Sequence, residues 1–159
     1  MENQGKAREL DPKGDYCLIQ DGDLNQFKDD SYDLALSAFT FDNIPTMEKK
    51  VGVFKELGRL LKSEGRLVNL VSSPEIYTHE WASFSTKEYP ENKYAKSGDK
   101  VRIVQTGLED KRPVEDVVWT DEYYQETYKR AGLELVQAYA RAVKSGKLYH
   151  QTNLSAFCT

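Results

Sequence analysis

The amino-acid sequence predicts an α/β protein with a mainly parallel sheet. Three apolar runs of strand length occur in the first half of the chain, at residues 16–20, 32–41 and 66–72. A segment of helical length, residues 46–62, separates the second run from the third. Strands joined through a helix by short connections are typical of parallel sheets. A chain of 159 residues can bury about two-thirds of its unfolded surface, so one domain with its own core is expected.

The first apolar run, YCLIQ at residues 16–20, lies between Gly14-Asp15 and Asp21-Gly22-Asp23. This pattern predicts a buried strand that ends in a turn. Cys17 belongs to this run, and Cys158 belongs to a similar run near the end of the chain. Two isolated cysteines form neither a disulfide framework nor a metal-binding spacing, so both are interpreted as small core residues.

The segment from Thr46 to about Lys62 has the pattern of an amphipathic helix. Thr46 is a favourable N-cap, and the carboxylate of Glu48 in the first turn favours the helix dipole. Apolar residues that recur at steps of three and four form one stripe: Val51, Phe54, Leu57, Leu60 and Leu61. Gly65 closes the helix, and the strand at 66–72 follows.

Residues 74–118 interrupt the α/β pattern. Two candidate strands, 101–106 and 114–119, flank a polar turn there, which predicts an inserted hairpin or lid. A helix is then predicted from Asp121 to Ala131, ended by Gly132.

The chain closes with two apolar runs, LELVQAYARAV (133–143) and NLSAFC (153–158). Because residues 145–147 join them directly, they are predicted to form an antiparallel pair that closes the sheet.

Composition excludes several classes of protein. Hydrophobic residues make up 39% of the chain and charged residues 30%, which is typical of a globular protein. The net charge is −4 and the basic residues are scattered, so no nucleic-acid partner is expected. No apolar run approaches the roughly 18 residues of a membrane helix, and the first residues contain no apolar signal sequence. We therefore expect a cytoplasmic protein without membrane association.

The run FKDDSYDLALSAFTFDNIP, followed by KELGRLLKSEGRLV, resembles the second half of class I S-adenosylmethionine-dependent methyltransferases. In that family, a phenylalanine, a few polar residues and S-F/Y-D open the fourth strand, and a helix ending L-x-R-L-L-K-x-G-G-x-L precedes the fifth. The matching residues are Phe27, Ser31, Tyr32, Asp33, Leu57, Arg59, Leu60, Leu61, Lys62, Gly65, Arg66 and Leu67. Glu64 stands where the family often has glycine.

The resemblance implies a partial Rossmann-like methyltransferase sheet flanked by helices, with residues 74–118 as a substrate lid inserted in a single domain, 1–159. It also implies S-adenosylmethionine as the cofactor and a small molecule as the methyl acceptor. No metal is expected, because no His, Cys or carboxylate cluster has ligand spacing.

The glycine-rich turn that holds most of the cofactor in this family has no counterpart in the chain, which contains no G-x-G. The family's sheet order is 3-2-1-4-5-7-6, so the run at 16–20 lacks its neighbouring strand. Three alternatives follow: the chain is a truncated piece of a longer methyltransferase, residues 16–20 pair directly with 32–41, or another chain completes the sheet. The last two require repacking or association, so a homodimer is expected more than a monomer.

Cofactor contacts are expected after the first two apolar runs. The resemblance gives Asp21 the adenine amino group and Gly22 the neighbouring amide contact, with Asp23-Leu24 as the shifted alternative. An ordinary solvated Asp-Gly turn is the other interpretation. Ser37 and Phe39, in the last part of the second run, are assigned to the cofactor as well.

Acceptor contacts are expected from the same loop and from the insertion. The candidate substrate-binding residues are Phe41, Asp42, Asn43, Tyr77, Trp81 and Trp119. Methyl transfer from a sulfonium is an in-line displacement that depends mainly on positioning. Where the acceptor must lose a proton, His79 is the candidate catalytic base, although a lone histidine also fits a structural role.

The sequence thus predicts a methyltransferase acting on a small molecule, with impaired cofactor binding in this chain alone. The alternative is a non-catalytic, methyltransferase-like module for binding or dimerisation. A nicotinamide-dependent enzyme would require a G-x-G-x-x-G motif, which the chain does not contain.

Overall fold

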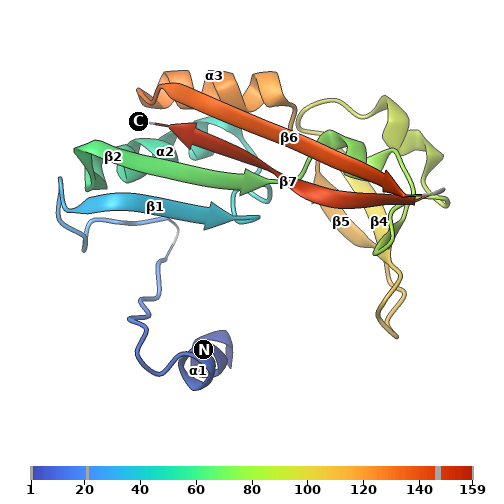
Figure 1. Ribbon diagram of the computed structural model, residues 1–159, viewed down its shortest axis with the longest axis horizontal. Coiled ribbons are helices and arrows are strands. Elements are labelled where there is room, and N and C mark those ends of the chain that lie inside the picture. Colours follow the sequence, from blue (N-terminus) through green and yellow to red (C-terminus); the bar gives the residue numbers. More distant parts are fainter. Residues whose placement is uncertain (1, 21, 146–147, 159) are drawn as a thin grey trace.

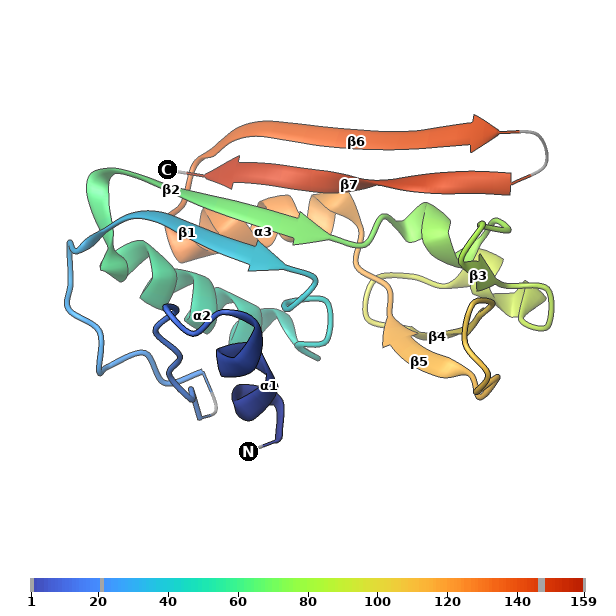
Figure 2. The same cartoon turned by 60° about the horizontal axis from the view of Figure 1, so that its bottom comes forward.

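A computed structural model of the protein describes residues 2–20, 22–145 and 148–158. Its larger sheet has the strand order β1-β2-β7-β6, and helices α2 and α3 cover one face of it (Figures 1 and 2). A smaller sheet of order β3-β4-β5 lies at one end, past the carboxyl end of β2. Helix α1 stands apart from both sheets. The α/β class predicted from the sequence is confirmed.

The elements have the following bounds, in chain order: α1 (Glu2–Leu10), β1 (Tyr32–Ala38), α2 (Met47–Leu60), β2 (Leu61–Val71), the 3-10 helix η1 (Pro74–Tyr77), β3 (Phe84–Ser85), the 3-10 helix η2 (Pro90–Tyr94), β4 (Lys100–Gln105), β5 (Val114–Val117), α3 (Asp121–Ala131), β6 (Leu135–Ser145) and β7 (Leu148–Cys158).

The larger sheet is mixed. β1 runs parallel to β2, with Ala35 opposite Leu67 and Ser37 opposite Asn69. β7 pairs antiparallel with both β2 and β6, as predicted for the last two strands. The parallel part predicted from the sequence is therefore limited to β1 and β2 among the described residues.

The strand predicted at residues 16–20 is not formed, and neither is its pairing with β1. Leu18 and Ile19 are 64% and 44% exposed, and Cys17, predicted to be buried, is exposed too. The physical reason is that a lone extended segment cannot satisfy its backbone groups without a neighbouring strand. The run is apolar, as a buried strand requires, but no strand among the described residues pairs with it.

Helix α2 is capped as the sequence predicts. The Thr46 hydroxyl accepts a hydrogen bond from the Lys49 amide, and Glu48 lies in the first turn. The helix ends at Leu60, and β2 begins at once. Gly65 permits this tight connection, because a Cβ there would lie 2.9 Å from the carbonyl oxygen of Lys62. Helix α3 is likewise capped by Thr120 and ended by Gly132, whose φ of 83° lies in the left-handed region.

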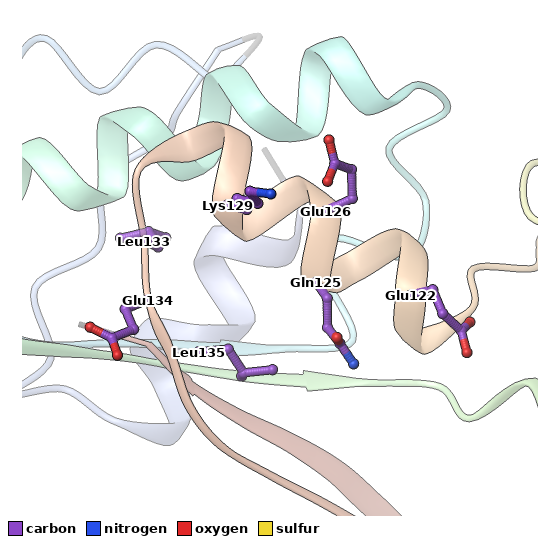
Figure 3. A pocket seen from close by; sticks show the side chains of 7 residues that line it. All are labelled: Glu122, Gln125, Glu126, Lys129, Leu133, Glu134 and Leu135. Carbon is purple, nitrogen blue, oxygen red and sulfur yellow. The ribbon is translucent and has the colours of Figure 1, made fainter.

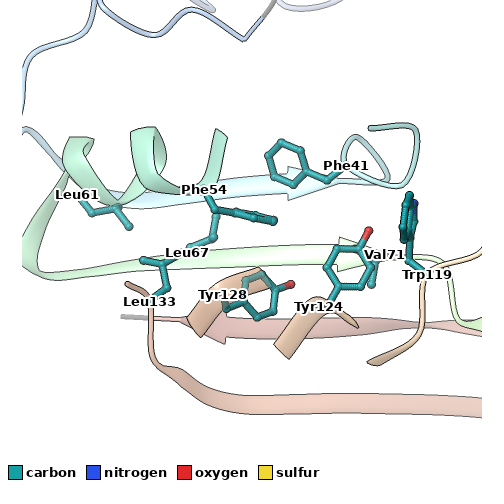
Figure 4. Close-up of a cluster of buried hydrophobic side chains, with 9 residues drawn as sticks. All are labelled: Phe41, Phe54, Leu61, Leu67, Val71, Trp119, Tyr124, Tyr128 and Leu133. Atoms are coloured by element: carbon teal, nitrogen blue, oxygen red, sulfur yellow. The ribbon is translucent and has the colours of Figure 1, made fainter. Parts of the chain in front are cut away.

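The main core lies between the sheet and the two helices. Phe54 of α2 is fully buried at its centre and meets Phe41 and Tyr128 edge-on, at ring-centroid distances of 4.8 and 5.1 Å. Figure 4 shows the members of this cluster: Phe41, Phe54, Leu61, Leu67, Val71, Trp119, Tyr124, Tyr128 and Leu133.

The opposite face of the sheet is not covered in the same way. Leu34 and Leu36 of β1 are 56% and 65% exposed, whereas Ala35 and Ser37, which alternate with them, face the helices. Aliphatic side chains on both faces are typical of a strand from the interior of a parallel sheet. β1 has this composition although it lies at an edge.

Replacement of Phe54 tests the central position of this residue. Phe54→Ala should lower the free energy of unfolding by about 3–5 kcal/mol, because it leaves a cavity between two aromatic rings. Chemical denaturation measures the change. Tyr94→Ala is the control, since Tyr94 is 83% exposed, and should change stability by less than about 0.5 kcal/mol. Equal effects of the two changes on stability would contradict the central position of Phe54 in the core.

Candidate functional site at the carboxyl end of β1

The loop after β1 begins with a strained residue. Phe39 has a φ of 54°, in a region that bulky side chains rarely adopt. Its amide donates to the carbonyl of Leu70 at 2.9 Å, which holds the turn against β2. The Phe39 ring is 41% exposed, whereas Phe41, two residues later, is buried in the core. Strain of this kind is concentrated at functional sites in proteins.

Asp42 is a buried carboxylate that organises the loop. One of its oxygens accepts from the Tyr124 hydroxyl at 2.7 Å and the other from the Ser72 amide at 3.0 Å. Its backbone carbonyl accepts from the indole nitrogen of Trp119 at 2.6 Å. Burial raises the pKa of Asp42, and the hydrogen bonds from Tyr124 and Ser72 oppose that shift.

Lys50 is a fully buried cation beside this carboxylate. Its amino group donates to the carbonyl of Phe41 and lies 3.4 Å from the Tyr124 hydroxyl. It also lies 4.3 Å from the ring centroid of Trp119 and 5.0 Å from that of Tyr124, as in a cation–π site. Burial lowers the pKa of Lys50 to about 8, although the charge of Asp42 acts in the opposite direction.

Two buried polar groups lie side by side on β1 and β2. Ser37 pairs in register with Asn69, and both side chains face the helices. The Asn69 amide donates to the Tyr128 hydroxyl at 2.9 Å. Among the described residues, the Ser37 hydroxyl and the Asn69 carbonyl oxygen have no hydrogen-bond partner. A polar strip thus leads from the strands towards Tyr124 and Lys50.

The insertion is attached to the sheet at both of its ends. Ser72 and Trp119 bind Asp42, as described above, and Tyr77 donates to Asp116 at 2.6 Å. Burial raises the pKa of the Tyr77 hydroxyl, and Asp116 adds to the effect. Trp81 lies in a second core cluster inside the insertion: Ile76, Tyr77, Trp81, Val101, Ile103 and Val118.

A surface hollow of about 760 Å³ adjoins the loop on its other side. Asn43 and Ile44 line it from the loop, Gly22 from the preceding segment and Val53 from α2. Gly22 has a φ of 78°, and a Cβ there would lie 3.3 Å from a methyl carbon of Val53. A smaller hollow next to it is also lined by Gly22, together with Asp23, Leu24 and Asn25. The absence of a side chain at Gly22 therefore keeps this space open.

Comparisons with known proteins agree with this arrangement. Residues 2–69 match the family model described as a methyltransferase domain. No curated protein matches the chain. Among solved structures, an S-adenosylmethionine-dependent methyltransferase from Methanosarcina mazei superimposes with a TM-score of 0.60 at 13% identity, over 92% of this chain and 66% of its own. The fold is that of an S-adenosylmethionine-dependent methyltransferase.

Two further structures share this methyltransferase fold. An S-adenosylmethionine-dependent methyltransferase from Mesorhizobium loti has a TM-score of 0.61 at 12% identity and covers 99% of this chain and 75% of its own. The 1,6-didemethyltoxoflavin-N1-methyltransferase of Burkholderia thailandensis has a TM-score of 0.51 at 13% identity, over 99% and 55%. The chain therefore spans between about half and three quarters of these methyltransferases. The resemblance inferred from its sequence is confirmed.

The methyltransferase fold brings some of the predicted site residues together. Phe41, Asp42 and Trp119 are in contact through the core and the Asp42 hydrogen bonds, and Tyr77 and Trp81 pack in the insertion. These side chains are buried, so they form walls rather than an open pocket. Ser37 is buried on β1, whereas Phe39 and Asn43 are exposed.

The structure describes His79 but not Asp21, so these two predicted site residues are treated separately. Asp21 lies outside the described residues, so its contact with adenine stays a prediction. His79 follows η1, and its Nδ1 lies 2.9 Å from the Thr78 hydroxyl and 3.2 Å from the carbonyl of Glu75. These contacts are with its own segment, and its catalytic role also stays a prediction.

Sequence reasoning missed Lys50, Tyr124 and Asn69. Lys50 does carry a signal, because it stands four residues before Phe54 on the apolar stripe of α2, where a lysine would have to be buried. Tyr124 lies one helical turn before Tyr128 on α3, and this spacing is the only signal that it carries in the sequence. Asn69 gives no signal in the sequence beyond a polar residue in an apolar strand.

A second hollow, of about 550 Å³, lies between α3 and β6 (Figure 3). Its lining includes Glu122, Glu126 and Glu134, with Lys129 among them. None of the predicted site residues contributes to it. Over the described ranges, no three His, Cys, Asp or Glu side chains are grouped as metal ligands. Within those same ranges, no helix is both long and apolar enough to cross a bilayer.

The lowered pKa of Lys50 predicts a pH dependence of stability. The unfolded chain holds the lysine proton up to its ordinary pKa of 10.5, whereas the folded protein releases it at about 8. Raising the pH between these values therefore favours the folded state. From about pH 7.5 to about pH 9.5, the free energy of unfolding should rise by about 2 kcal/mol from this group.

Denaturation of Lys50→Met over this range measures that contribution, since methionine keeps a similar volume but carries no proton. The rise should disappear in Lys50→Met and persist in Lys49→Met, because Lys49 is exposed. An unchanged rise in Lys50→Met would show that Lys50 is not the group responsible.

Proposed function

We propose that the chain forms the acceptor-side part of a methyltransferase that uses S-adenosylmethionine and methylates a small molecule. The hollow kept open by Gly22 supports this proposal most directly, because it lies against the loop that follows the first parallel strand. In open α/β sheets, ligands bind beyond the carboxyl ends of the parallel strands. Because the fold is that of a methyltransferase, the ligand expected there is S-adenosylmethionine.

The residues present fit the adenine end of the cofactor. Gly22 in a left-handed turn exposes backbone groups to the hollow, and Ile44 and Val53 offer apolar surface to a flat ring. Asp21 would accept from the adenine amino group, and Ser37 and Phe39 would lie nearer the methyl group. For the methionine end, the glycine-rich turn of the family has no counterpart in this sequence, so these residues are assigned no part of it.

The aromatic walls beside the loop support a small, flat acceptor. Phe41 and Trp119 are buried in the core beside the loop, and Tyr77 and Trp81 are buried in the separate cluster of the insertion, which would act as the lid. The Burkholderia methyltransferase was solved with 1,6-didemethyltoxoflavin and S-adenosylhomocysteine bound. Flat, apolar ligands bind in pockets lined by such side chains with a few polar groups.

The chain's own residues contribute positioning rather than covalent chemistry. The bound cofactor supplies an activated methyl group, and the displacement then depends on alignment. Asp42 holds the loop and the lid through Tyr124, Ser72 and Trp119, so it acts as a positioning residue. Asn43 is exposed at the hollow and can orient a ligand by hydrogen bonding. Where the acceptor must lose a proton, His79 would accept it.

Cofactor binding is tested by calorimetric titration with S-adenosylhomocysteine. Gly22→Val should weaken binding at least about tenfold, because the side chain would occupy the hollow and strain the turn. Gly107→Val is the control, since nothing lies within 4 Å of a Cβ at Gly107. Asp21→Ala should also weaken binding if this residue holds the adenine amino group.

Absence of binding by the folded, unmodified chain would argue against the proposal. It would favour the alternative, a non-catalytic module with a methyltransferase fold.

The role of His79 requires a turnover measurement. Release of S-adenosylhomocysteine is followed with a panel of small amines and phenols. His79→Gln should lower the rate about a hundredfold, within the usual range for general base catalysis, and leave the affinity for S-adenosylhomocysteine unchanged. His150→Gln is the matched control. Equal rates for His79→Gln and the unmodified chain would exclude this histidine as the base.

A further inference from the structure

Arg59 binds one distant segment of the chain at several points. It lies in the last turn of α2, within the helix motif found in the sequence, and the proposed function gives it no role. Its Nη2 donates to the carbonyl of Leu24 at 3.1 Å, and its Nη1 donates to that of Phe27 at 3.2 Å. Nη1 also binds the carboxylate of Asp29. One guanidinium thus holds three residues of the segment that leads from Gly22 to β1.

The backbone of the same segment is bound to the end of α2. The Asp30 amide donates to the carbonyl of Arg59 at 3.1 Å, and the Ser31 amide donates to that of Leu60 at 2.9 Å. Asp30 has a φ of 50°, in the left-handed region that residues other than glycine seldom adopt. Strain of this kind persists where surrounding contacts fix the backbone, and here those contacts come from the last turn of α2.

Arg59 also binds the helix side of the two hollows beside the loop. Gly22 and Glu56 both line each hollow, Gly22 from the turn and Glu56 from α2. A carboxylate oxygen of Glu56 accepts from Nε and Nη2 of Arg59 at 3.0 and 2.9 Å. Leu24 lines the smaller hollow from the turn side, and its carbonyl is bound to the same guanidinium. Arg59 therefore connects the two sides of this space.

The separation between the turn and α2 sets the width of the hollows. A Cβ at Gly22 would lie 3.3 Å from a methyl carbon of Val53, so the turn and the helix are close to contact. Without the side chain of Arg59, the hydrogen bonds left between this segment and α2, over the residues described, would be those of Asp30 and Ser31. Both lie further along the chain, beyond the turn itself.

We propose that Arg59 is a positioning residue of the ligand site, which fixes the turn at Gly22 and the carboxylate of Glu56 at the separation that the adenine end of the cofactor requires. The proposal rests on the proposed function, since it concerns the same hollow. Arg59 itself does not touch the ligand, because its N–H groups are used by the hydrogen bonds to protein oxygens. Its planar fork of donors holds a geometry that a lysine ammonium cannot reproduce.

Amide hydrogen exchange of the unliganded chain tests whether Arg59 holds the segment. In Arg59→Lys, exchange at Phe27, Asp30 and Ser31 should become at least about tenfold faster, because the charge is kept but the fork is lost. Arg66→Lys is the matched control, since Arg66 belongs to the same motif but is exposed and makes no side-chain hydrogen bond with the described residues. The amides that pair β2 with β7 should exchange at the unmodified rate in both variants.

Calorimetric titration with S-adenosylhomocysteine tests the effect on the ligand site. Arg59→Lys should raise the dissociation constant at least about tenfold, whereas Arg66→Lys should leave it unchanged. In Arg59→Ala, millimolar methylguanidinium should restore both the affinity and the slow exchange. Ethylammonium should restore neither, because it has the charge without the fork. A general loss of stability would not be reversed by one of these two cations alone.

Unchanged exchange at Phe27, Asp30 and Ser31 in Arg59→Lys would overturn the proposal, whether or not the chain binds S-adenosylhomocysteine. Equal affinity of Arg59→Lys and the unmodified chain would also overturn it, while the proposed function would stand. Faster exchange in Arg59→Lys, with no binding by the unmodified chain, would overturn the proposed function and limit Arg59 to a structural role.

Discussion

The hydrogen bonds of Asp42 are the interaction on which the rest of the structure depends. One buried carboxylate joins the loop after β1 to Ser72 after β2 and to Tyr124 of α3, and its backbone accepts from Trp119. A charge at this depth is costly unless it is compensated. The positive charge of Lys50 compensates part of the negative charge of Asp42. The ring of Trp119 lies against the amino group of Lys50. Three segments that are distant in sequence, at Asp42, at Ser72 and at Trp119–Tyr124, are thereby fixed around one point.

Much of the fold follows from patterns that are local in sequence. The cap at Thr46, the stripe of α2 and the stop at Gly132 each depend on a few neighbouring residues, and each is found as predicted. The antiparallel pair at the end of the chain also follows from its short connection. Residues 16–20 could not be predicted in this way, because an apolar run forms a strand only where another strand is available to pair with it.

The candidate site was predictable only in part, for a related reason. The resemblance to methyltransferases assigns Phe41, Asp42 and Trp119 to the site by their position along the chain, and that assignment stays a prediction. Which of them would be exposed could not be inferred, because burial results from packing between α2, α3 and the insertion. Asn69 and Tyr128 meet across the core without any sequence proximity, and only the tertiary structure brings them together.

The attachment of the insertion has a consequence for how such a protein can change. The residues that flank it, Ser72 and Trp119, are held by the same aspartate, so the chain leaves and rejoins the sheet at nearly one place. What lies between them can be lengthened, shortened or exchanged without moving β2 or α3. The sheet is then a constant platform, and under the proposed function selectivity for the acceptor would reside in a replaceable module, inherited or grafted as a unit.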